Sequence, residues 1–503
     1  MKFDSSVIRF NFRDKEFRQN IYQIFSDSLP NYFYLCAPIL LLTISIVFLN
    51  NNGATAEVID GVGVADQWLI ISNVIVFSSL NTGTSTLAAQ AHGAQNFKLV
   101  GIYLHRALVL RIALLIPGIL LLLWTEKILS FIGVTPEVAF NAGIYCQNVI
   151  IGVVALSMSD TLKSYVIAHN IFLPLLYIQG SLILVQIFMC QFFVSWLGLG
   201  LAGAAYAFSA TQLIGFALIV IYIWKWKATE HTLFWPESSS FNIGELFTQL
   251  KQETWIGLFM FIEWMGYLIV FLLAARLSVK ELQAFVYMNN AVAIVYFLPA
   301  GVAVTLGTYI AGAMGDGNLV AVKKHARVGN ASGLIITIFS CALLFGIPEA
   351  AMRIYTEDIE IIKIGATLLR TYGCYYILDC QQMLLNSMIK AIGKEVEGAI
   401  IFSISIFGVG ITSAYLLCFV VGLESRGLLV GIAIGIGLMV AFSIYLLKKV
   451  DLEELSLRIR IRANADKDEN TESNSPIHYE LREIRKLKSA TIHFHDDVYS
   501  RLK

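Results

Sequence analysis

Charge is scarce in this sequence: only 14 % of its 503 residues are Asp, Glu, Lys or Arg. A soluble chain of this length needs far more charge to cover its surface. The net charge is zero, so electrostatics give no indication of a nucleic-acid partner. The nucleotide-binding pattern G-x-x-x-x-G-K-[ST] is absent, which argues against an ATP-driven pump. The seven cysteines lack metal-ligand spacing and are expected to pack as small apolar residues. The sequence therefore predicts no enzyme, no metal site and no bound cofactor.

Hydrophobic residues are abundant instead. They make up 57 % of the chain, whose mean hydropathy is +0.69. Apolar runs of at least about 18 residues recur, which predicts an all-α integral membrane protein with twelve transmembrane helices. The expected spans are 31–50, 58–89, 98–124, 139–161, 171–195, 201–224, 254–277, 283–311, 327–348, 361–392, 397–421 and 427–447.

An even number of spans places both ends of the chain on one side of the membrane. Lys and Arg concentrate in the segments on that side, so the positive-inside rule predicts cytoplasmic termini. The N-terminal segment 1–30 carries no cleavable signal pattern, and the first span is expected to direct insertion. A polar cytoplasmic linker, 225–253, separates an N-terminal lobe, 31–224, from a C-terminal lobe, 254–447.

The C-terminal tail, 448–503, has a different composition from the rest. Asn464–Pro476 is polar and is typical of disorder, so most of this cytoplasmic tail is expected to be disordered. Leu452–Arg462 is amphipathic and is expected on the membrane surface.

Three prolines fall inside predicted spans. Pro38, Pro174 and Pro299 are expected bend sites, because proline lacks the backbone donor that continues a helix. In a membrane the carbonyl left unpaired must find a partner within the protein.

The two halves of the chain resemble each other. Ala88–Ala107 aligns with Ile310–Gly329 at an offset of about 222, and Ser164–Asn170 and Gly198–Gly203 find counterparts at nearly the same offset. Six spans per copy keep both copies in one orientation, so we expect two pseudo-symmetric lobes related by an axis along the membrane normal. Generic similarity between hydrophobic helices is the alternative.

Several segments carry a more specific signal. Ser85–Leu108 (STLAAQAHGAQNFKLVGIYLHRAL), Phe261–Tyr267 (FIEWMGY), Tyr296–Asn318 and Ser387–Gly410 resemble signatures of the multidrug and toxic compound extrusion (MATE) family, in its eukaryotic form. The resemblance covers roughly residues 28–447. It implies an antiporter that exports organic, often cationic compounds in exchange for H⁺ or, less commonly, Na⁺.

The resemblance also assigns residues. Glu263 corresponds to the family's essential seventh-helix glutamate, and Asp379 falls where the family has an acidic residue in the tenth helix. Asn290 and Leu268 stand where eukaryotic relatives often have glutamates. The chain therefore has fewer buried acids than the family pattern.

An acidic residue at the centre of a membrane helix costs roughly 2.5 to 3.5 kcal/mol, which marks it as a candidate functional site. Burial favours the protonated form, so Glu263 is expected to hold either a proton or a cationic substrate, with Asp379 as its partner. Trp264 and Tyr267 are expected to flank Glu263 with aromatic faces that suit an organic cation.

Each site prediction has a structural alternative. Glu263 could be neutral and hydrogen-bonded, and neighbouring tyrosines with Gln382 could satisfy Asp379 locally. Asp160 could line a polar site in the first lobe or cap a cytoplasmic helix end. Gln90 could belong to the same polar site or support the turn after the second span.

The sequence thus predicts a proton-coupled, alternating-access exporter of small organic compounds, acting as a monomer in the lipid bilayer of the plasma membrane, a vacuole or another organelle. A lipid or lipid-precursor flippase of related fold, or a receptor or scaffold that transports nothing, is the rival interpretation.

Overall fold

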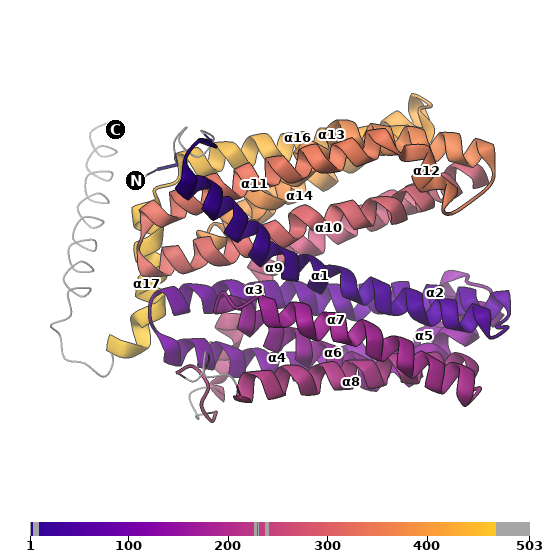
Figure 1. Ribbon diagram of the computed structural model, residues 1–503, viewed down its shortest axis with the longest axis horizontal. Helices are drawn as coiled ribbons and strands as arrows, with labels where there is room; N and C mark the ends of the chain where they lie inside the picture. The colour runs from indigo at the N-terminus through magenta and orange to yellow at the C-terminus, as the bar shows by residue number, and fades with distance from the viewer. Residues whose placement is uncertain (1, 4–9, 226–228, 230, 237–240, 469–503) are drawn as a thin grey trace, which may run out of the picture.

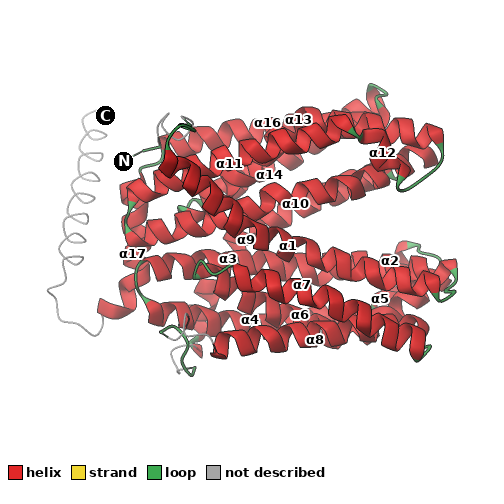
Figure 2. Ribbon diagram, in the orientation of Figure 1, coloured by secondary structure: helices red, strands yellow, loops and turns green. Residues whose placement is uncertain are grey.

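The computed structural model describes residues 2–3, 10–225, 229, 231–236 and 241–468. Within these ranges the regular structure is entirely helical (Figure 2). Of the segment predicted to be disordered, Asn464–Pro476, residues 464–468 are helical, which corrects that prediction, and the rest of the tail lies outside the described residues.

The first six spans form the N-lobe. They are built from α1 (Lys15–Asn51), α2 (Ala56–Leu69) continued through a π-helical turn, η2 (Ile70–Val74), into α3 (Ile75–Gly93), α4 (Phe97–Leu123), the short α5 (Thr125–Ile132), α6 (Pro136–Ala168), α7 (Leu173–Cys190) with η3 (Gln191–Trp196), and α8 (Gly200–Lys225).

The next six spans form the C-lobe. They are α9 (Ile243–Ala274), α10 (Val279–Asp316), α11 (Leu319–Gly346), the short α12 (Pro348–Arg353), α13 (Ile359–Ala391), a span assembled from α14 (Glu395–Ser403), η6 (Ile404–Ile411), α15 (Thr412–Tyr415) and η7 (Leu416–Val420), and α16 (Glu424–Lys449). A last helix, α17 (Leu452–Asp468), follows.

Eleven helical spans in the described residues are long and apolar enough to cross a membrane. The remaining long helix, α13, has 33 residues and packs against α10, α11 and α16. It is more polar than the others because it carries Asp379, Gln382 and several tyrosines on its buried side. The chain is a multi-pass membrane protein with twelve helical spans.

The repeat is visible in the order of elements. A short helix follows the third span of each lobe, α5 in one and α12 in the other. Asn96 caps α4 by accepting from the backbone N–H of Leu99, and Asn318 caps α11 by accepting from that of Ala321. These caps lie at the equivalent positions of the two copies, so the similarity extends to local backbone chemistry and is not merely shared hydrophobicity.

The predicted bends meet different outcomes. Pro38 and Pro299 lie inside α1 and α10, where each interrupts the backbone hydrogen-bond ladder. The prediction for Pro174 as a bend is wrong, because this residue lies in the first turn of α7. Proline is favoured there, since the first N–H groups of a helix have no intrahelical acceptor.

The boundaries of the linker and the tail differ from the sequence-based prediction. Helix α9 begins at Ile243, so the last part of the predicted linker is helical. Helix α17 covers the amphipathic piece expected on the membrane surface, but its apolar residues Leu452, Leu455 and Ile459 are buried against the protein.

The lobes lie as two layers that meet at one end (Figure 1). This terminal side is the end where α1 begins, α16 ends and α17 lies. There α3 packs against α10, and α1 packs against α10 and α11. Asn31 donates to the Thr305 hydroxyl over 2.9 Å, and Tyr309 donates to Asp27. The molecule is therefore held together between the lobes on the terminal side.

Candidate functional site

Glu263 lies within the C-lobe, half-buried on α9. Its Oε1 accepts a hydrogen bond from the Tyr296 hydroxyl of α10 at 2.8 Å. The same oxygen accepts from Nε2 of Gln382, on α13, at 3.1 Å. Three helices thus converge on one carboxylate oxygen.

Asp379 joins the same cluster. Its Oδ1 accepts from Gln382 Nε2 at 3.0 Å, and its Oδ2 accepts from the Tyr372 hydroxyl at 2.6 Å. The Gln382 amide nitrogen therefore bridges Glu263 and Asp379, the two acids that the family resemblance assigns. Among the described residues, the hydrogen-bond donors to both carboxylates are neutral, so no hydrogen-bonded cation there compensates either charge.

A small, half-open pocket lies beside Glu263 and encloses about 20 Å³, room for roughly one water molecule. One side is lined by Glu263, Tyr267 and Gln382, whose polar atoms are almost wholly covered. The other wall is apolar and is formed by Phe402, Ile406, Ile432 and Ile436. Ligand pockets are typically about 300 to 1,000 Å³, so this space is too small for an organic molecule unless its walls move apart.

The two aromatic residues predicted to flank Glu263 are placed differently. Tyr267 is one helical turn further along α9, lines the pocket, and lies edge-on to Tyr296 with ring centroids 6.3 Å apart. Trp264 does not line the pocket, because consecutive residues of a helix point about 100° apart. Asn290 is exposed on α10 and is likewise absent from the pocket wall.

Asp160 is paired within its own helix. Its Oδ1 lies 3.0 Å from Nζ of Lys163, one turn along α6, and both residues are buried. Lys163 Nζ also lies 5.5 Å from the ring centre of Tyr34, on α1. The geometry places Asp160 inside the N-lobe beside its counter-ion, away from the Glu263 pocket.

Gln90 contacts the opposite lobe. Its Nε2 donates to the backbone oxygen of Ala391 over 2.9 Å, and Arg462 of α17 donates to its Oε1. Gln90 is buried at the terminal side. These contacts fit the structural alternative, in which Gln90 supports the turn, and they also join the two lobes, which the sequence did not predict.

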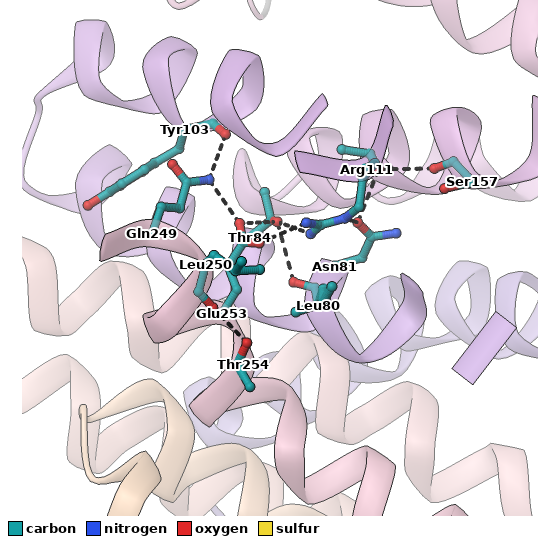
Figure 3. A network of polar contacts seen from close by, with 11 residues as sticks. Leu80, Asn81, Thr84, Tyr103, Arg111, Ser157, Gln249, Leu250, Glu253 and Thr254 are labelled. Atoms are coloured by element: carbon teal, nitrogen blue, oxygen red, sulfur yellow. Dashed lines mark hydrogen bonds and ion pairs between the residues drawn. The ribbon is translucent and has the colours of Figure 1, made fainter. Parts of the chain in front are cut away.

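A second polar network, which the sequence did not predict, lies between the lobes (Figure 3). Arg111 of α4 forms an ion pair with Glu253 of α9, with Nη1 2.8 Å from Oε2. Arg111 also donates to Asn81 and Thr84, on α3, at 3.1 and 2.9 Å. Thr84 and Gln249 donate to the other oxygen of Glu253, at 2.7 and 2.8 Å. Every charged oxygen of Glu253 is therefore satisfied.

Close backbone approach accompanies this network. A Cβ atom at Gly83 would lie 2.5 Å from the Cα of Glu253, so only glycine permits α3 and α9 to pack at this distance. The N-terminal half of α9 is thus fixed to the N-lobe, and its C-terminal half carries Glu263 into the C-lobe.

Sequence reasoning missed both members of this ion pair for identifiable reasons. Glu253 falls within the predicted polar linker, and Arg111 lies in an apolar stretch of the third span, α4, five residues after Arg106. The signal that could have found Arg111 is its position, since a buried arginine within a membrane span requires an acidic partner.

Comparison with known proteins supplies independent information. The family model for MatE matches residues 30–192 and 256–416. Multidrug and toxin extrusion protein 2 of Mus musculus is 26 % identical over 421 residues, covering 82 % of this chain and 72 % of that protein. Protein DETOXIFICATION 16 of Arabidopsis thaliana is 24 % identical, covering 80 % of this chain and 84 % of that protein. The crystal structure of the eukaryotic MATE transporter AtDTX14 superposes with a TM-score of 0.80 at 20 % identity, covering 89 % of this chain and 99 % of that one.

Proposed function

The chain belongs to the MatE family of transporters, and on that premise we propose that it is a secondary antiporter that exports organic compounds in exchange for H⁺. The observation that carries this proposal is the pairing of Glu263 and Asp379 through the Gln382 amide.

Two carboxylates bridged by one neutral donor favour a state in which one of them is protonated. Like charges at short range disfavour double ionisation, and the two groups titrate as one coupled pair. A cation that enters the adjoining pocket would stabilise the doubly ionised pair and displace the proton. Competition between proton and cation at one site is the chemistry that exchange requires.

The pocket supports a class of substrate. Its lining of Phe402 and three isoleucines suits hydrocarbon or ring atoms. Glu263 and Tyr267 line the other side, where the carboxylate is covered in this conformation and would meet a cation once the walls separate. We therefore propose amphipathic organic cations. Relatives named multidrug and toxin extrusion proteins fit organic substrates in general.

The arrangement of the lobes supports alternating access. The hydrogen bonds between lobes described above lie in the terminal halves or near the middle of their helices, from Asn31–Thr305 to Arg111–Glu253. With the terminal side cytoplasmic, as Lys and Arg distribution predicts, the structure corresponds to a state closed to the cytoplasm.

Transport by purified protein in liposomes tests the proposal. Uptake of tetraethylammonium would be measured under an imposed pH gradient and, separately, under an imposed Na⁺ gradient, with protein-free liposomes as the control. We expect uptake driven by the pH gradient alone. Uptake that follows only the Na⁺ gradient would show that Na⁺, not H⁺, is the coupling ion. No uptake under either gradient would contradict the proposed exchange of organic cations.

A further inference from the structure

Helix α17 is attached to the C-lobe both by the chain and by packing. Only Val450 and Asp451 separate it from the end of α16. Leu452, Leu455 and Ile459 are buried, and Ser456 donates to the backbone oxygen of Met314, at the end of α10, over 2.8 Å. Burial of this apolar face makes the attachment to the C-lobe stable.

The far end of α17 reaches the N-lobe. Arg462 donates to the side-chain oxygen of Gln90, and Nδ2 of Asn96 donates to the backbone oxygen of Ala463 over 2.6 Å. Asn96 and Ala463 are both buried. In Figure 1, α17 crosses the end of the molecule from one lobe to the other.

The surface beneath α17 is the seam between the two copies of the repeat. A Cβ at Gly93 would lie 1.9 Å from the backbone oxygen of Gly312, so the N-lobe turn touches the C-lobe backbone directly. A Cβ at Gly315 would lie 2.0 Å from the backbone oxygen of Gln90. Met314 accepts a hydrogen bond from Ser456, and Gln90 accepts one from Arg462. These two acceptors therefore lie on opposite sides of one closed seam.

We infer that α17 is a latch that stabilises the state closed on the terminal side. This inference rests on the proposed alternating-access function, in which the seam must open to load substrate from that side. The two-residue connection keeps α17 with the C-lobe, so opening must break its contacts with Gln90 and Asn96.

The distribution of contacts suits a releasable latch. On the C-lobe, α17 buries an apolar face, which is costly to expose. On the N-lobe, the described hydrogen bonds are those of Gln90 and Asn96, which water can replace at modest net cost. The contacts with the N-lobe are therefore the ones that break on opening. Arg462 is the side chain of α17 that makes one of them.

Distances between the lobes test the latch without relying on transport. Spin labels at Lys98 and Val320, equivalent exposed positions on the terminal ends of α4 and α11, report opening by double electron–electron resonance. The labels are attached through noncanonical amino acids, because the chain has seven cysteines. The protein is measured in lipid nanodiscs, with and without tetraethylammonium and at two pH values.

Two changes remove the latch and two leave it in place. Arg462→Ala should raise the ratio of long-distance to short-distance populations about fivefold, the effect of roughly one net hydrogen bond. Removal of 451–503 takes away both hydrogen bonds to the N-lobe and should raise the ratio by more than fivefold. Arg458→Ala removes the same charge from α17, but Arg458 is exposed and pairs with Glu454 of the same helix. Arg458→Ala and removal of 469–503 should leave the ratio unchanged.

The outcomes separate the latch from the proposed function. An unchanged ratio in Arg462→Ala and in the 451–503 truncation, with two populations present in the full chain, would overturn the latch alone. A single population in the full chain at every pH and substrate concentration would contradict alternating access itself, and the latch with it. If the truncation fails to fold, Arg462→Ala decides the question.

Discussion

Arg111 and Glu253 form an ion pair across the two lobes in which neither side chain is exposed to solvent. Glu253 lies ten residues before Glu263 on α9, about 15 Å along the helix axis. One helix therefore carries both a fully buried ion pair between the lobes and the candidate coupling carboxylate. A movement of α9 relative to the N-lobe would therefore displace both Glu253 and Glu263.

Removing one member of the ion pair should destabilise the protein. Glu253→Gln leaves Arg111 charged and buried with incomplete compensation, at a cost of about 3 to 5 kcal/mol. We expect a clearly lower thermal unfolding temperature for the purified protein in detergent. Glu16→Gln is the matched control, because Glu16 of α1 pairs with Lys324 of α11, also between the lobes, and both side chains are exposed. The control should lose at most about 1 kcal/mol. Equal losses in the two variants would show that the buried pair contributes no more than a surface pair.

The Gln382 amide should be needed for rapid exchange. Gln382→Leu removes the donor shared by Glu263 and Asp379 and leaves two carboxylate oxygens with fewer partners. Hydrogen bonds to charged groups contribute about 1.5 to 3 kcal/mol each, so we expect pH-driven uptake to slow by about tenfold or more. Gln381→Leu, one residue away on α13, makes neither contact and serves as the control. Similar rates in both variants would remove Gln382 from the coupling site.

The orientation of the chain can be determined independently of transport. A glycosylation cassette inserted after Gly133, in the turn that ends α5 on the far side, should be modified in the endoplasmic reticulum. The same cassette appended after Lys503 should remain unmodified if the termini are cytoplasmic. The reverse pattern of mass shifts on the purified protein would invert the proposed direction of transport.

The sequence was sufficient to predict the helical spans and the two acids of the C-lobe. Continuous apolar runs identify membrane helices without knowledge of their partners, because each span satisfies its own backbone hydrogen bonds. Glu263 stands out because an acid is costly in such a run, whereas Asp379 was assigned by the resemblance to the MATE family. Their contact through Gln382 follows from helix packing, which the spacing along the chain does not encode.

Three features depended on partners far away in the sequence. The start of α9 was predicted too late, since Gln249 and Glu253 look like linker residues until Arg111 and Thr84 are placed beside them. The amphipathic face of α17 fits a membrane surface and a protein surface equally well, and only the folded lobes offer the latter. Trp264 neighbours Glu263 in sequence, but helical geometry turns it away from the pocket.

Proton release on binding tests the central claim most directly. Tetraethylammonium is added to purified protein in weakly buffered detergent solution, and released protons are measured with a pH-sensitive dye while tryptophan fluorescence reports binding. We predict proton release from the wild-type protein and none from Glu263→Gln, with Glu16→Gln behaving as wild type. Equal proton release from the wild type and Glu263→Gln, at equal occupancy, would contradict competition between proton and substrate at Glu263.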